Sequence, residues 1–122
     1  MTGAKQRGIW GEGVALEFMI NKGYTFIDKG FRSRFGEIDI IVKNDKFLVF
    51  IEVKTRKNAH FAHAREYVGS EKQKKIIATA KYWLIKNPVK LQPRFDVIEI
   101  YASNGVLTLS PDIIHIENAF GA

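Results

Sequence analysis

The 122-residue sequence contains no cysteine, which excludes disulfide bonds and metal sites built on thiolates. It has no run near the roughly 18 consecutive apolar residues that a membrane-spanning helix needs. Residues 1–7 lack the apolar core of a signal peptide. Acidic side chains are also in short supply, because 13 Asp and Glu residues face 19 Lys and Arg residues. We therefore expect one cytoplasmic domain over residues 1–122, with no membrane partner.

The excess of positive charge is concentrated in one part of the chain. The net charge is +6. Residues 54–90 contain ten basic and two acidic residues, whereas the remainder contains nine basic and eleven acidic ones. A Lys-rich segment of this kind is either a solvated helix face or a surface that neutralises phosphates. The charge thus favours a polyanionic partner, either a nucleic acid or an anionic surface.

Hydrophobic periodicity predicts an α/β fold with a mixed β-sheet flanked by helices, in the order α-β-β-β-α-β-β. A turn at Asn44-Asp45 joins two strands into a hairpin, and a capping box from Ser70 to Gln73 opens the second helix. The tail, 111–120, is apolar enough to pack on the core. The expected helices cover 8–22 and 70–86, the expected strands 24–28, 36–43, 47–55, 95–101 and 106–109, and an irregular segment 58–69.

One acidic residue interrupts the apolar face of the first helix. At 100° per residue, Glu12 falls inside the apolar stripe, where a carboxylate is costly unless it is paired or bound to a metal. The alternative is that Glu12 lies at the edge of the stripe and reaches water or an arginine. The expected stripe consists of Ile9, Ala15, Leu16, Met19 and Ile20.

The hairpin carries two more acids in apolar surroundings. Alternation places Glu52 and Lys54 on the same face of their strand. With the turn at 44–45, Asp39 lies opposite Phe50, and Glu52 is its diagonal neighbour. Two converging carboxylates either form a salt-bridge cluster with Lys54 or share a hard cation. Oxygen ligands of this kind suit Mg²⁺ or Mn²⁺.

These residues resemble a known motif. The pair Asp39 and Glu52-Val53-Lys54 is similar to the Asp…Glu-x-Lys motif of the PD-(D/E)xK nuclease superfamily, and the whole chain resembles the YraN-like family of small bacterial proteins, which is grouped with endonucleases. The resemblance implies a restriction-endonuclease-like core, related to Holliday-junction resolvases. It is carried by Gly11-Glu12, Gly36-Glu37-Ile38-Asp39, Glu52 to Arg56, Lys72-Gln73, Arg94-Phe95-Asp96 and Asn118-Ala119-Phe120.

The resemblance also implies roles for individual residues. Asp39, Glu52 and the Val53 carbonyl would hold Mg²⁺ or Mn²⁺, and Lys54 would position or activate the attacking water. Glu12 matches the helix-borne acid of resolvase-like members. Gln73 matches a helical glutamine near the scissile phosphate, although a capping bond to Ser70 is an equal alternative.

The expected function is metal-dependent hydrolysis of phosphodiester bonds in nucleic acid, with DNA, including branched DNA, as the expected partner. The alternative is a nucleic-acid-binding module with negligible or partner-dependent activity. An apolar patch of Trp10, Val14 and Phe18 is either a homodimer surface or is covered by the C-terminal tail. The expected phosphate contacts are Arg32, Arg34, Arg56, Lys57, Lys72 and Lys75.

Overall fold

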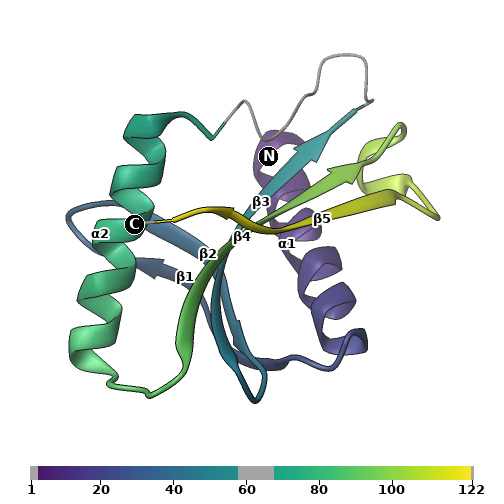
Figure 1. Ribbon diagram of the computed structural model, residues 1–122. Coiled ribbons are helices and arrows are strands. Elements are labelled where there is room, and N and C mark those ends of the chain that lie inside the picture. Colours follow the sequence, from purple (N-terminus) through teal and green to yellow (C-terminus); the bar gives the residue numbers. More distant parts are fainter. Residues whose placement is uncertain (1–2, 58–67, 122) are drawn as a thin grey trace.

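A computed structural model describes residues 3–57 and 68–121 of the chain, with side chains from Lys5 onward. One five-stranded sheet, in the order β1-β2-β3-β4-β5, forms its centre. All neighbouring strands are antiparallel except β3 and β4, which are parallel and joined through α2 (Figure 1). The elements are α1 (Gly3–Asn21), β1 (Thr25–Arg32), β2 (Glu37–Lys43), β3 (Phe47–Arg56), α2 (Ser70–Lys86), β4 (Gln92–Tyr101), the 3₁₀ helix η3 (Gly105–Leu107) and β5 (Asp112–Phe120).

This architecture confirms the predicted α/β class and the order α-β-β-β-α-β-β. The last strand is β5, in the C-terminal tail, whereas residues 105–107 form the 3₁₀ helix η3. The prediction of a strand at 106–109 was therefore wrong. Gly105 has a positive φ of 57°, and the Asn104 amide donates to the Thr108 hydroxyl at 2.9 Å. These local contacts close a short turn at the place where a strand was expected.

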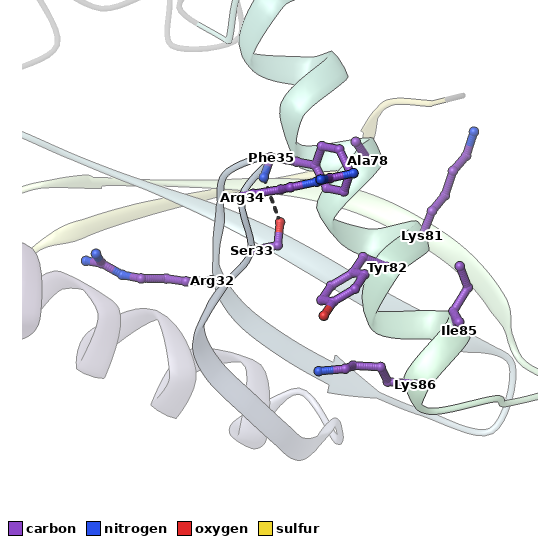
Figure 2. A pocket seen from close by; sticks show the side chains of 9 residues that line it. All are labelled: Arg32, Ser33, Arg34, Phe35, Ala78, Lys81, Tyr82, Ile85 and Lys86. Carbon is purple, nitrogen blue, oxygen red and sulfur yellow. Dashed lines mark hydrogen bonds between the residues drawn. The ribbon is translucent and has the colours of Figure 1, made fainter.

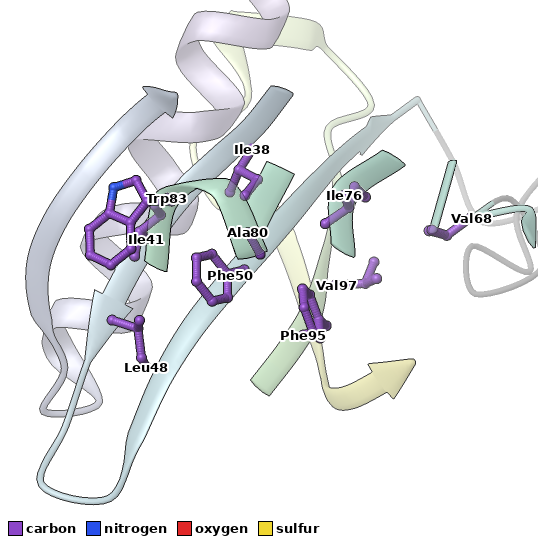
Figure 3. Packing of buried hydrophobic residues seen from close by; sticks show 10 residues of the cluster. All are labelled: Ile38, Ile41, Leu48, Phe50, Val68, Ile76, Ala80, Trp83, Phe95 and Val97. Atoms are coloured by element: carbon purple, nitrogen blue, oxygen red, sulfur yellow. The ribbon is translucent and has the colours of Figure 1, made fainter. Parts of the chain in front are cut away.

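The two helices cover opposite faces of the sheet (Figure 1). Alternation along β3 sends Phe50 to the face under α2 and Ile51 to the face under α1, which explains why this central strand is apolar on both sides. Trp83 of α2 packs edge-on to Phe50, with ring centroids 6.0 Å apart (Figure 3). Each helix is thereby held against its own half of the core.

The buried face of α1 differs from the expected stripe. Ile9 and Ile20 are 64% and 47% exposed, whereas Gly11, Ala15 and Met19 are buried. The small residues at positions 11 and 15 let the helix approach β3 closely, and this contact decides which side faces the sheet. The buried direction is therefore rotated away from Ile9 and leaves the neighbouring Glu12 half-buried at its edge.

The β2–β3 hairpin is confirmed, but its register differs from the prediction. The Asn44 amide donates to the Phe47 carbonyl at 3.0 Å, and the Asn44 side-chain oxygen accepts from the Phe47 amide at 2.7 Å. The turn therefore falls one residue later than expected, and Ile40 pairs with Ile51. Continuing this register brings Asp39 directly beside Glu52 rather than diagonal to it.

The predicted capping box at the start of α2 is not formed. The N-cap is Gly69, which has no side chain to bond, and Ser70 is already the first helical residue. The Gln73 side-chain amide donates instead to the Val68 carbonyl at 2.7 Å. The N-terminus of the helix is thus tied to the end of the preceding segment, most of which, 58–67, lies outside the described residues.

Candidate functional site

A polar hollow of about 310 Å³ opens where β2 and β3 meet the N-terminal half of α1 and the first turn of α2. Strand β2 contributes Asp39 and strand β3 contributes Glu52, Val53 and Lys54. We call it the carboxylate hollow. It is lined by Arg7, Gly8, Glu12, Asp39, Glu52, Val53, Lys54, Thr55 and Lys72. Six of the predicted residues are therefore brought together: Glu12, Asp39, Glu52, Val53, Lys54 and Lys72.

The two central carboxyl groups have different partners. Asp39 Oδ2 accepts a hydrogen bond from the Val53 amide at 2.8 Å and, within the described part of the chain, forms no ion pair. Glu52 is buried, and its Oε2 lies 2.5 Å from Lys72 Nζ and 3.4 Å from Lys54 Nζ. The alternative of a Glu52–Lys54 salt bridge is therefore present, but it leaves Asp39 without a cation.

The charge state of Asp39 reflects this imbalance. Burial and the nearby Glu52 carboxylate raise the pKa of Asp39 to about 7. Burial raises the pKa of Glu12 as well, with Glu37 adding to the effect. Burial lowers the pKa of Lys54, although Glu52 opposes the shift. Three carboxyl groups and three cations line the hollow, so burial and the adjacent Glu52, rather than an overall excess of negative charge, set the raised pKa of Asp39.

Glu12 reaches the hollow because α1 lies very close to β3. A Cβ atom added at Gly11 would clash with Thr55 Oγ1, so glycine at this position permits the close approach. Glu12, the next residue, lines the hollow beside Asp39 and Glu52. The Gly11-Glu12 pair therefore combines a packing requirement with a side chain directed to the site.

The other predicted residues are placed less uniformly. Lys72 lines the carboxylate hollow, and Lys75 lines an adjoining one together with Gly36, Asp39 and Glu52. Gln73 is occupied by its bond to Val68, and its role near a scissile phosphate stays a prediction.

The four predicted arginine and lysine contacts outside α2 divide into two pairs. Arg32 and Arg34 line a different hollow, next to α2. Arg56 ends β3, where its carbonyl accepts from the Ala102 amide at 2.8 Å. Lys57 lines a hollow with Tyr101 and Ser103. The basic residues are thus distributed along the surface rather than gathered at the carboxylates.

The donor set of the carboxylate hollow fits a hard divalent cation. Asp39 and Glu52 offer carboxylate oxygens, and the Val53 carbonyl is a neutral oxygen donor on the same strand. No group of three or more His, Cys, Asp and Glu side chains within 3–57 and 68–121 is arranged to hold a metal ion. The side-chain donors are thus limited to a pair of carboxylates, which suits Mg²⁺ because this ion keeps several waters.

A second charged cluster, which the sequence analysis did not identify, lies in the core. The Asp96 carboxylate accepts from Arg94 at 2.9 and 2.7 Å, and its Oδ2 lies 2.7 Å from His115 Nε2. The Asn118 amide donates to Asp96 at 2.9 Å. Hydrogen bonds from His115 and Arg94 outweigh burial and lower the pKa of Asp96. Because the carboxylate is fully satisfied, this cluster joins β4 to β5 and has no free group for chemistry.

The apolar patch on α1 is partly covered. Trp10, Val14 and Phe18 are half-buried and pack with Ile113 of β5 against the core. The alternative in which the C-terminal tail covers the patch thus has a structural basis, and a homodimer stays a prediction.

Sequence reasoning missed Arg7 and Thr55 in the carboxylate hollow, because only tertiary packing places these residues beside the acids.

None of the helices in the described part of the chain is long and apolar enough to cross a membrane.

Residues 11–100 match the model of the uncharacterised protein family UPF0102. A UPF0102 protein of Clostridioides difficile is 44% identical over 95% of this chain and 97% of its own length. UPF0102 proteins of Persephonella marina and Caldanaerobacter subterraneus are 39% and 40% identical, over 93% and 95% of this chain and 92% and 95% of their own. The chain therefore belongs to the UPF0102 family, the YraN-like family.

Proposed function

We propose that the protein is a metal-dependent endonuclease of the PD-(D/E)xK type that hydrolyses phosphodiester bonds in nucleic acid. The observation that carries the proposal is the convergence of Asp39, Glu52 and Lys54 on one open hollow. Their positions on two paired strands make the arrangement rigid, as a catalytic site requires. The proposed ligands are Asp39, Glu52 and the Val53 carbonyl. When bound there, Mg²⁺ or Mn²⁺ would polarise the phosphate and lower the pKa of a water molecule.

The side chains of the hollow would share the remaining work. Lys54 lies beside Glu52, and its lowered pKa makes it easier for this ammonium to give up a proton. It would orient the attacking water or stabilise charge on a phosphoryl oxygen. Lys72 is half-exposed and contacts Glu52 from α2, so it can exchange this bond for one to a phosphate. Lys75, one turn further along α2, would hold the adjacent phosphate.

A binding module without turnover is the second candidate. It is favoured by the Lys72–Glu52 ion pair, which occupies one oxygen of the proposed metal ligand. In this case the ammonium stabilises Glu52 permanently, and the hollow serves only to place basic residues. Titration with Mg²⁺ or Mn²⁺ by calorimetry distinguishes the candidates, because only the nuclease requires metal binding. Absence of metal binding with DNA present would favour the module.

The decisive experiment measures cleavage of duplex, flap, junction and single-stranded DNA with Mg²⁺ and Mn²⁺. Asp39→Ala and Glu52→Ala are expected to abolish cleavage and to leave DNA binding largely intact, because binding depends on basic residues elsewhere. Asp45→Ala, which removes an acid from the exposed β2–β3 turn, is the matched control and is expected to keep activity. Cleavage that survives in the Asp39→Ala/Glu52→Ala double variant would refute the proposed site.

A further inference from the structure

A second hollow, with a volume of about 660 Å³, lies between the β1–β2 turn and α2. Figure 2 shows side chains from both elements around it. We call it the aromatic hollow. It is lined by Arg32, Ser33, Arg34, Phe35, Ala78, Lys81, Tyr82, Ile85 and Lys86.

Two aromatic rings are exposed in this hollow. Phe35 and Tyr82 are 40% and 37% exposed. Both rings extend into the space between the turn and the helix (Figure 2). Exposed rings in a concave site are typical of surfaces that bind a ligand by stacking. The turn holds Phe35 in place, because its amide donates to the Ser33 hydroxyl at 3.0 Å.

Cations accompany both rings. The Arg34 guanidinium lies 5.1 Å from the centre of the Phe35 ring, and Lys86 Nζ lies 4.9 Å from the centre of the Tyr82 ring. Lys81 adds a third positive charge, although its side chain extends away from the two rings in Figure 2, and none of the described residues that line the hollow is acidic. Arg32 also extends away from the rings in Figure 2, and it pairs with Glu37 at 3.0 Å. Two cations thus lie at the rings, and Lys81 lies at the rim of the hollow.

We propose that the aromatic hollow binds unpaired nucleotides of a nucleic-acid strand. Bases would stack on Phe35 and Tyr82 as Arg34 and Lys86 move from the ring faces to the phosphates, and Lys81 would contact a further phosphate. This combination of ring faces and positive charge is how proteins bind single strands without reading their sequence. An acidic peptide would use the cations but not the ring faces, and a duplex keeps its bases stacked inside. A single strand therefore uses more of the lining than either.

The inference rests on the proposed function for the direction of the strand. Lys72 at the carboxylate hollow and Tyr82 are ten residues apart on α2, or about 15 Å along its axis. Gly36 and Lys75 line the adjoining hollow that lies between them. At roughly 3.4 Å per nucleotide of a stacked strand, the aromatic hollow would hold bases about four to five nucleotides from the scissile phosphate. The substrate class is accordingly a branched, gapped or flapped nucleic acid.

Fluorescence anisotropy in EDTA tests the binding without any contribution from metal or cleavage. The probes are a labelled thymidine oligonucleotide and an abasic strand of the same length and charge. The wild-type protein is expected to bind the base-bearing strand about ten-fold more tightly, as stacking on one or two rings would give. Equal affinity for the two strands would overturn the proposal, as would tighter binding of a Glu-rich peptide of equal charge.

Variants locate the effect. Tyr82→Leu is expected to weaken binding of the base-bearing strand by about five- to ten-fold, which is no more than the preference over the abasic strand, whereas Tyr82→Phe keeps the ring and is expected to keep the affinity. The matched control is Phe26→Leu, because Phe26 is 43% exposed on the far end of β1. Circular dichroism checks that each variant folds. Should Tyr82→Leu fail to fold, the abasic comparison with the wild-type protein still decides. An effect of Phe26→Leu as large as that of Tyr82→Leu would overturn the proposal.

The two proposals fail separately. Cleavage that survives in the Asp39→Ala/Glu52→Ala double variant, with the preference for base-bearing strands intact, would overturn the carboxylate hollow as the catalytic site and leave the aromatic hollow as a binding site. Cleavage without any preference for base-bearing strands would overturn the aromatic hollow and leave the catalytic site standing.

Discussion

Asp39 is expected to make the protein less stable as the pH rises from 5 to 8 in the absence of divalent cations. Its pKa is raised to about 7 in the folded protein, chiefly by burial and by Glu52, from an ordinary value of 3.8. Between these values the folded protein holds a proton that the unfolded chain has lost. The free energy of unfolding therefore falls as the pH rises through this window, and the loss is complete above pH 7.

The size of the effect follows from the shift. Each pKa unit corresponds to about 1.4 kcal/mol, so the full shift corresponds to about 4 kcal/mol, and the part of it above pH 5 sets an upper bound of about 3 kcal/mol on the loss between pH 5 and pH 8. Because the hollow is open to water, which screens the repulsion between Asp39 and Glu52, we expect a fall of about 1–2 kcal/mol. Asp96 does not contribute, because its lowered pKa keeps it ionised throughout this range.

Urea unfolding in EDTA, followed by tryptophan fluorescence at pH 5 and pH 8, measures this difference. The control is Asp39→Asn, which keeps an oxygen to accept the Val53 hydrogen bond but does not titrate. Between pH 5 and pH 8, the free energy of unfolding of this variant is expected to fall by about 1–2 kcal/mol less than that of the wild-type protein. Identical pH dependence in both proteins would refute the assignment of the raised pKa to Asp39.

Two further predictions concern packing. Gly11→Ala is expected to destabilise the protein by about 1–3 kcal/mol through overpacking against β3. The control is Gly13→Ala, where an added Cβ meets nothing within 4 Å, and it is expected to be neutral or to stabilise α1 by up to about 1 kcal/mol. Equal midpoints of urea unfolding for the two variants would contradict the close approach of α1 to β3. Asp96→Asn is expected to cost about 3 kcal/mol, the lower end for a broken buried ion pair, because the buried Arg94 guanidinium then keeps only its ion pair with the exposed Glu117 at 3.2 Å. A loss below about 1 kcal/mol in the same assay would mean that a surface ion pair had been mistaken for a buried one.

Periodicity alone determined the fold class and most elements. Central strand β3 was recognisable because both of its faces are apolar, and the hairpin because Asn44-Asp45 favours a turn. The two acids Asp39 and Glu52 stood out because alternation places them where apolar residues are expected. These are local properties, which depend on the period of a strand and not on its neighbours.

One local contact in the turn and the packing of α1 on the sheet decided what the sequence pattern left open. The turn moved by one residue because the Asn44 side chain bonds the Phe47 amide, and this shift alone put Asp39 directly beside Glu52. The buried side of α1 was set by its close contact with β3 at Gly11, which no helical period reveals.

The sequence by itself determined that two carboxylates and a lysine lie on two neighbouring strands, because residue type and alternation are carried by the chain. Only the tertiary structure decided that Lys72 contacts Glu52 and that Phe35 and Tyr82 share one hollow. Both pairs join α2 to the sheet or to its turns. Such contacts depend on how the helix packs on the sheet, and that packing is a property of the whole core rather than of any one segment.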